Sequence, residues 1–125
     1  MVTVEYQVLE NEIHHFKFLE STLQTLEDWF EQVEKIEQEK GDEAICRYLV
    51  DATEAYPPIR HIFQKASQRI LRGDIPQSRI AILHRRSVLV TMVEVFIRRL
   101  PQMKRHQVRL FLAEERDKAI DWLLL

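Results

Sequence analysis

Polar side chains that could bind an anion follow two predicted strands of this chain. Asp51 and Thr53 belong to the segment LVDAT at 49–53, and the tetrad HRRS at 84–87 follows RIAIL at 79–83. Two guanidinium groups beside the free N–H groups of a helix start favour a phosphate or a carboxylate. We therefore expect Arg85 and Arg86 to border a cleft that accepts an anion, although a solvated basic loop with a helix cap would give the same pattern. The candidate site residues are Asp51, Thr53, His84, Arg85, Arg86 and Ser87.

The carboxyl ends of parallel strands meet at one edge of a sheet, which is where α/β proteins bind ligands. Glu114 and Glu115 follow a third such segment, VRLFL at 108–112, and should reach the same edge. Asp51 could act there as a general acid or base if it were buried. A lone Asp after a strand is more often a turn residue that accepts hydrogen bonds from nearby N–H groups.

The sequence holds no complete catalytic, metal or cofactor motif. Cys46 has no His or Cys neighbours, so we interpret it as a small apolar residue of a buried strand. His14 and His15 are adjacent in a strand and point to opposite faces, and the other histidines are isolated, so no zinc site is expected. Two glycines cannot build a Gly-rich phosphate loop. We expect a protein that is not an enzyme and that carries no metal or cofactor.

Composition indicates one globular domain over residues 1–125. Of the 125 residues, 46% are apolar and 30% are charged. The net charge of −2 gives no bulk attraction to nucleic acid, and the basic segment RRLPQMKRH at 98–106 is typical of a solvated loop or a complement to an acidic helix. No apolar run approaches the roughly 20 residues of a membrane span, and no signal peptide is visible. A cytoplasmic location is expected.

Five strands are predicted from short apolar runs bounded by turn residues. Val2, Val4, Tyr6 and Val8 alternate with polar residues, which is the pattern of a half-buried strand. The predicted strands span 2–9, 13–19, 44–50, 79–83 and 108–112. The short turn at 10–12 favours a hairpin of the first two strands, and the alternative is that the LVDAT strand lies between them.

Helices separate the later strands. Ser21 and Gln24 form a capping-box pattern, and Gly41 is placed to end the first helix in a left-handed conformation. Asp51 to Tyr56 is interpreted as a loop before Pro57 and Pro58, which suit a helix start. Further helices are predicted at 57–72, 87–100 and 113–125. The order β-β-α-β-α-β-α-β-α then gives a five-stranded, mostly parallel sheet with helices on both faces.

The closing segment RLFLAEERDKAIDWLLL carries a family resemblance. A strand ending near Phe111, followed by acidic residues, Ala119 and the Trp122-Leu123 pair, resembles the C-terminal end of SpoIIAA-like proteins of the STAS/SEC14 type. The resemblance implies a compact α/β domain that acts through protein contacts or binds a small ligand. Anti-sigma factor antagonists of the wider group carry a phosphorylatable Ser after an Asp. The corresponding stretch DATEAYPPIRHIF contains no Ser, so this switch is not expected here.

We therefore expect a regulatory or protein-interaction module. The alternative is a carrier or sensor of a small anionic or amphipathic molecule, bound at the carboxyl edge of the parallel strands. An enclosed pocket beside HRRS would favour the sensor, and a flat apolar face would favour the interaction module. The helices at 57–72 and 87–100 are apolar beyond a single stripe, so we expect self-association through one of them, and the alternative is that they are buried on two sides.

Overall fold

A computed structural model describes residues 2–41, 45–72, 76–85 and 106–125. Its centre is a five-stranded sheet in the order β1-β2-β3-β4-β5. The strands are β1 (Val4–Val8), β2 (Ile13–Phe18), β3 (Cys46–Asp51), β4 (Ser78–His84) and β5 (His106–Leu112). The first two pair antiparallel and every later pair is parallel. The hairpin is therefore correct, and β3 does not lie between β1 and β2.

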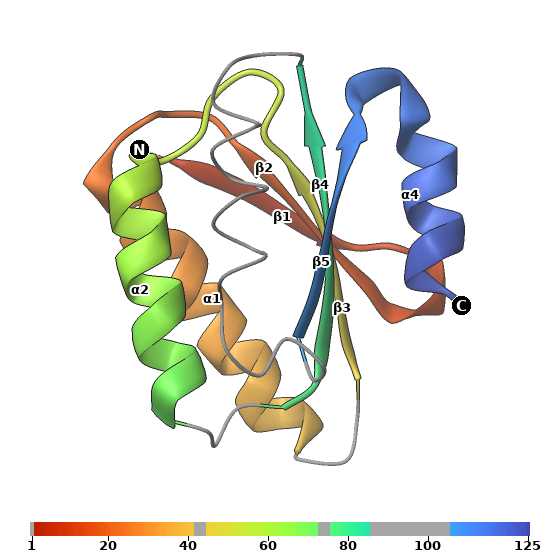
Figure 1. Ribbon diagram of the computed structural model, residues 1–125, viewed down its shortest axis with the longest axis horizontal. Coiled ribbons are helices and arrows are strands. Elements are labelled where there is room, and N and C mark those ends of the chain that lie inside the picture. The colour runs from red at the N-terminus through yellow and green to blue at the C-terminus, as the bar shows by residue number, and fades with distance from the viewer. Residues whose placement is uncertain (1, 42–44, 73–75, 86–105) are drawn as a thin grey trace.

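Helices cover both faces of the sheet, as the strand–helix alternation predicts. The structure describes α1 (Leu23–Lys40), α2 (Ile59–Arg72) and α4 (Arg116–Leu123), with short 3₁₀ turns at Glu10–Glu12 and Ala113–Glu115. Figure 1 shows α1 and α2 on one side of the sheet and α4 on the other. The helix predicted at 87–100, with its Ser87 cap and Pro101, lies outside the described residues. Residues 98–105 of the basic segment also lie outside the described residues.

Local signals placed the helix ends to within a residue or two. The N-cap of α1 is Thr22 and not Ser21, because the Thr22 hydroxyl accepts a hydrogen bond from the Thr25 N–H. Gly41 ends the helix, as predicted, and its φ of 76° is positive. Its ψ of 177° is extended, so the predicted left-handed helical conformation was wrong. The Pro58 carbonyl accepts the first hydrogen bonds of α2, from the N–H groups of His61 and Ile62.

The period-2 alternation of the strands divides the core into two layers. Phe16, Tyr48 and Val50 are buried under α1 and α2. Ile13, Leu49 and Ala81 are buried on the other face, against Ala119 and Leu123 of α4. Cys46 is buried in β3, as predicted. His14 and His15 point to opposite faces, since the His14 ring lies 6.0 Å from the Tyr48 ring in a tilted contact, while His15 contacts Arg116 of α4.

The first strand is less buried than its alternation predicts. Tyr6 is 38% exposed and Val8 is 56% exposed, so only Val4 fits a half-buried pattern. The reason is position, because β1 is the edge strand and has a neighbouring strand on one side only. A period-2 sequence pattern reports which face a side chain points to, and it does not report whether a helix covers that face.

Candidate functional site

A cavity of about 310 Å³ lies between α2 and the carboxyl ends of the parallel strands. Its walls come from β2, α1, β3, the segment after β3, α2, β4 and β5. The described lining residues are Phe18, Trp29, Val50, Ala52, Thr53, Tyr56, Ile59, Ile62, Phe63, Ile82, His84, Arg85 and Leu110. Ten of these thirteen are apolar, so the described residues form a hydrophobic pocket with a few polar groups, which is the usual composition of a small-molecule site.

Small side chains follow β3 and line the pocket. Val50 and Ala52 point to the same face as Ile82 and His84 of β4, since side chains alternate along each strand. Ala52 stands where a larger residue would fill the space beneath α2. The helix side of the cavity is formed by Ile62 and its neighbours, which are only partly buried.

Two predicted site residues on β4 and its C-terminal end line this pocket. His84, the last residue of β4, is half-buried, and its Nδ1 lies 3.0 Å from the Arg85 carbonyl oxygen. A carbonyl can only accept, so Nδ1 carries the proton in this contact. Arg85 follows the strand and is exposed, which places a permanent positive charge at the edge of an apolar cavity. Arg86 and Ser87 lie outside the described residues.

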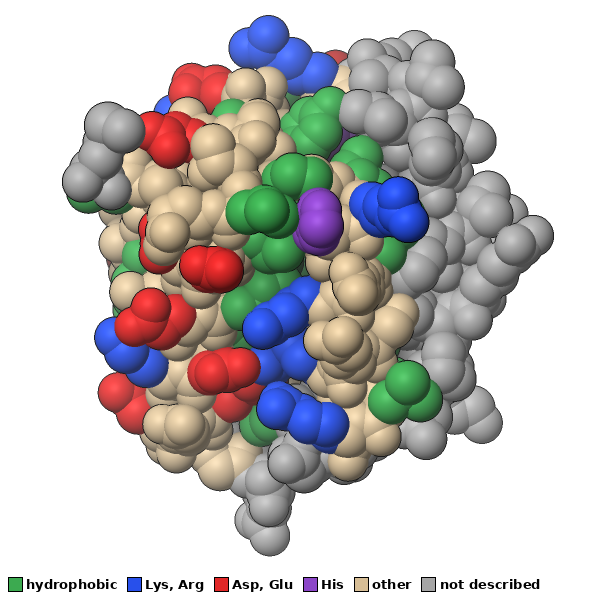
Figure 2. All heavy atoms as spheres, turned by 90° about the vertical axis from the view of Figure 1, so that its left-hand side faces the viewer, with side chains coloured by type: hydrophobic (Ala, Val, Ile, Leu, Met, Phe, Trp, Pro, Cys, Tyr) green, Lys and Arg blue, Asp and Glu red, His purple; other side chains and the backbone are tan. Residues whose placement is uncertain are grey.

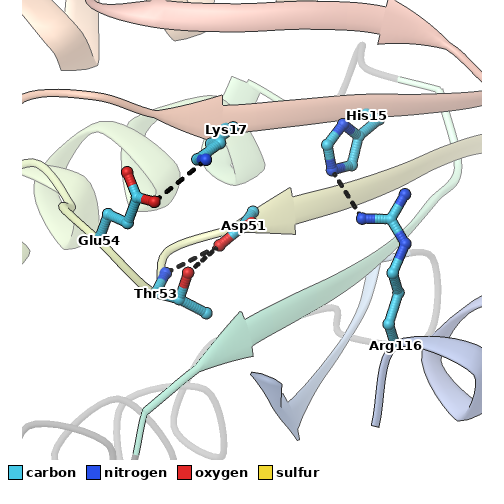
Figure 3. A network of polar contacts seen from close by, with 6 residues as sticks. All are labelled: His15, Lys17, Asp51, Thr53, Glu54 and Arg116. Atoms are coloured by element: carbon cyan, nitrogen blue, oxygen red, sulfur yellow. Dashed lines mark hydrogen bonds and ion pairs between the residues drawn. The ribbon is translucent and has the colours of Figure 1, made fainter. Parts of the chain in front are cut away.

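Asp51 does not belong to the pocket. The prediction of a loop beginning at Asp51 was wrong by one residue, because Asp51 is the last residue of β3. Its side chain points to the α4 face. Its Oδ1 accepts hydrogen bonds from the Thr53 N–H at 2.9 Å and from the Thr53 hydroxyl at 2.6 Å (Figure 3). This is the turn geometry of an Asp that fixes the chain after a strand. Thr53 thus lines the pocket while its hydroxyl proton is donated to Asp51.

A second polar group lies around the same strand ends, and Figure 3 shows its members. Lys17 of β2 forms an ion pair with Glu54 at 3.2 Å. Arg116 Nη1 donates to His15 Nε2 at 3.5 Å, because a guanidinium cannot accept. Burial lowers the pKa of His15, Arg116 lowers it further, and Asp51 opposes both. The lowered pKa of His15 favours its neutral ring, which can accept from Arg116. The polar groups of this set therefore satisfy one another, through one ion pair and several hydrogen bonds.

Within residues 2–41, 45–72, 76–85 and 106–125, no three His, Cys, Asp or Glu side chains lie close enough together to hold a metal ion. No helix in these ranges is long and apolar enough to cross a membrane. Three buried polar atoms of the described residues have no hydrogen-bond partner, and they are His14 Nε2, Trp29 Nε1 and Tyr48 Oη.

Known proteins resemble this chain in fold rather than in sequence. No known protein family matches it, and no curated protein does. It is similar to the crystal structure of an uncharacterised DUF3478 protein with a SpoIIAA-like fold from Shewanella loihica PV-4. The TM-score is 0.64 at 17% sequence identity, over 96% of this chain and 91% of that one. The chain has a SpoIIAA-like fold. The strand order, the mostly parallel sheet and the helices on both faces agree with the resemblance seen in the closing segment.

Sequence patterns predicted only the polar part of this site. The motifs singled out Asp51 and HRRS, which are polar residues at strand ends. The aromatic and aliphatic lining, such as Trp29 and Phe63, carries the same helical spacing as ordinary core residues. One signal was available, because Ala52 lies two residues beyond the buried Val50, and His84 lies two residues beyond the partly buried Ile82, on the same face of the sheet.

Proposed function

We propose that this protein is a non-enzymatic binding module whose pocket takes an amphipathic small molecule with an anionic head group. The supporting observation is the cavity of about 310 Å³ with apolar walls and with His84 and Arg85 at its edge. Its size falls at the lower end of small-molecule sites, which begin near roughly 300 Å³. A flat apolar face, which would favour a pure interaction module, is not what the described residues form here.

Charge fixes the orientation of such a ligand. An apolar tail gains free energy by leaving water for the surface formed by Trp29, Val50 and Ile62. A carboxylate or phosphate would be left unpaired at that depth, at high cost. The head group therefore belongs beside Arg85, which is exposed and offers a fork of N–H donors. Asp51 does not oppose this arrangement, since it lies on the other face of the sheet.

A regulatory protein-interaction role is the second candidate, and the surface around the pocket favours it. Figure 2 shows acidic side chains gathered over α1, basic ones along α2, and apolar side chains exposed between them. Tyr56 is 37% exposed and also lines the pocket. A bound ligand would contact Tyr56 and change what this surface offers to a partner, so binding and regulation are compatible.

Calorimetric titration with decanoate and with decanol tests the proposal, because the two molecules share a chain and differ in head group. We expect decanoate to bind more tightly than decanol, and native mass spectrometry of protein purified from its source to show a retained small molecule. Equal affinities for decanoate and decanol would show that an anionic head group does not contribute to binding. Absence of binding by both molecules, together with an unliganded native mass, would overturn it.

A further inference from the structure

The open edge of β1 is a second surface with defined binding chemistry, independent of the pocket. The Leu9 N–H donates to the Ile13 carbonyl and the Leu19 N–H donates to the Thr3 carbonyl, both at 2.8 Å. Hydrogen-bonded positions alternate along an antiparallel pair. In the register of β1 and β2, the odd-numbered residues of β1 therefore bond to β2. The backbone N–H and C=O groups of Val4, Tyr6 and Val8 consequently point away from the sheet.

No proline or bulge among the described residues prevents this edge from pairing with another strand. Proteins protect edge strands with prolines, bulges or several charges. The register of β1 against β2 is continuous over five residues, without a bulge or a proline, and Glu5 is its one charged residue. Tyr6 and Val8 are exposed apolar side chains on one face of the strand. The edge thus offers unpaired backbone groups next to apolar side chains.

We propose that β1 pairs antiparallel with β1 of a second copy, about a two-fold axis through Tyr6. This register pairs all five strand residues and places the outward N–H and C=O groups of Val4, Tyr6 and Val8 in hydrogen-bonding positions. Val4 then lies opposite the partner's Val8, and Glu5 lies opposite the partner's Gln7. The two sheets become one ten-stranded sheet.

Self-complementarity favours a second copy over a strand of another protein. In the register about Tyr6, the apolar side chain of Val4 lies opposite that of the partner's Val8. The side-chain amide of Gln7, which can donate a hydrogen bond, lies opposite the carboxylate of the partner's Glu5. A two-fold axis through Glu5 would instead place two carboxylates face to face. This surface differs from the helices at 57–72 and 87–100, which the sequence favoured for self-association.

Charge substitutions at Gln7 test the register, because Gln7 is exposed on the edge strand. Gln7→Lys places a cation opposite the partner's Glu5, twice per dimer, and should tighten the dimer. Gln7→Glu places a carboxylate there and should weaken it. From cross-strand pair energies, each change is expected to be about 2- to 30-fold in the dissociation constant. Gln38→Lys and Gln38→Glu, at an exposed position of α1, are the controls of equal net charge.

Sedimentation equilibrium from low to high micromolar concentration supplies the measurement, with circular dichroism as the check of folding. We expect a reversible dimer whose dissociation constant moves in opposite directions for the two Gln7 variants and much less for the Gln38 variants. A protein that stays monomeric at high micromolar concentration, also as Gln7→Lys, overturns the proposal. A dimer that responds equally at both positions overturns it as well, since its contact would then lie elsewhere.

Discussion

Arg69 of α2 donates a hydrogen bond to Glu34 of α1, with 3.2 Å between Nη1 and Oε1. Its second nitrogen, Nη2, is hydrogen-bonded to Glu37 of the same helix. The guanidinium also lies over the Phe30 ring, 5.3 Å from its centroid. Arg69 is only 6% exposed, which is rare for an arginine and requires such partners. This contact joins the two helices on one face of the sheet and so positions α2 over the pocket.

Replacing Arg69 should destabilise the protein. In Arg69→Ala the mostly buried Glu37 keeps its charge and loses its partner, and the packing on Phe30 is lost as well. We expect a loss of about 2 kcal/mol in the free energy of unfolding, measured by urea denaturation. Arg60→Ala removes an exposed arginine of the same helix and should cost less than about 0.5 kcal/mol. Similar losses in both variants would show that the buried contact contributes little.

Arg47 holds the C-terminal end of α4. Its Nε donates to the Leu123 carbonyl at 2.7 Å, and Arg79 Nη1 donates to the Trp122 carbonyl at 3.3 Å. The last carbonyls of a helix have no partner within the helix, so these donors satisfy them. Arg47→Ala should cost about 1.5 kcal/mol and accelerate hydrogen exchange in α4. Lys118→Ala, on the exposed side of the same helix, serves as the control. Unchanged exchange in Arg47→Ala would contradict this role.

His14 should make the stability fall on acidification. It is buried on β2, with Nδ1 2.8 Å from Tyr6 Oη. Burial lowers the pKa of His14 and Lys40 lowers it further, while Glu12 and Glu39 oppose the shift. The unfolded chain, with an ordinary histidine pKa near 6.5, then binds this proton first. Stability is therefore full above about pH 6.5 and is lost as the pH falls from there toward the lowered pKa of the folded state.

The variant His14→Phe tests this assignment, since it keeps a ring on the core face and removes the titrating group. Urea unfolding at pH 7.5 and pH 5 should show a smaller drop in stability than for the original chain. Some drop should remain, because the pKa of His15 is also lowered by burial. His61→Phe, at an exposed position of α2, should leave the drop unchanged. An equal drop with and without His14 would assign the acid sensitivity to other groups.

Two pocket variants should separate the tail and the head of the proposed ligand. Ile62→Trp adds a large ring to the helix wall and should abolish binding of both decanoate and decanol. Arg85→Gln removes the charge at the edge of the pocket, so it should weaken the binding of decanoate by about tenfold. The affinity for decanol should be unchanged. Arg60→Gln, an exposed arginine of α2 outside the pocket lining, is the control in calorimetry. Equal loss for both molecules in Arg85→Gln would argue against a head-group contact.

The sequence alone determined the order of elements and the face to which each strand residue points. These predictions rest on local signals, because local conformational preferences follow from neighbouring residues. The signals are the alternation along Val50 and Ala52, the turn residues at 10–12 and the glycine at 41. The hairpin, the parallel strands, the buried Cys46 and the opposed His14 and His15 could therefore be predicted. The predicted N-cap, Ser21, was wrong by one residue, since the N-cap is Thr22, and the prediction of a helix start at this place was correct.

Only the tertiary structure decided which of these residues meet. Asp51 ends β3 with its side chain on the α4 face, whereas Arg85, one residue beyond the end of β4, borders the pocket under α2. The burial of Arg69 depends on two carboxylates more than thirty residues away in the chain. The pocket itself is a shortage of side-chain volume between α2 and the sheet. Such a shortage arises from the separation of packed elements, a distance that no stretch of sequence encodes by itself.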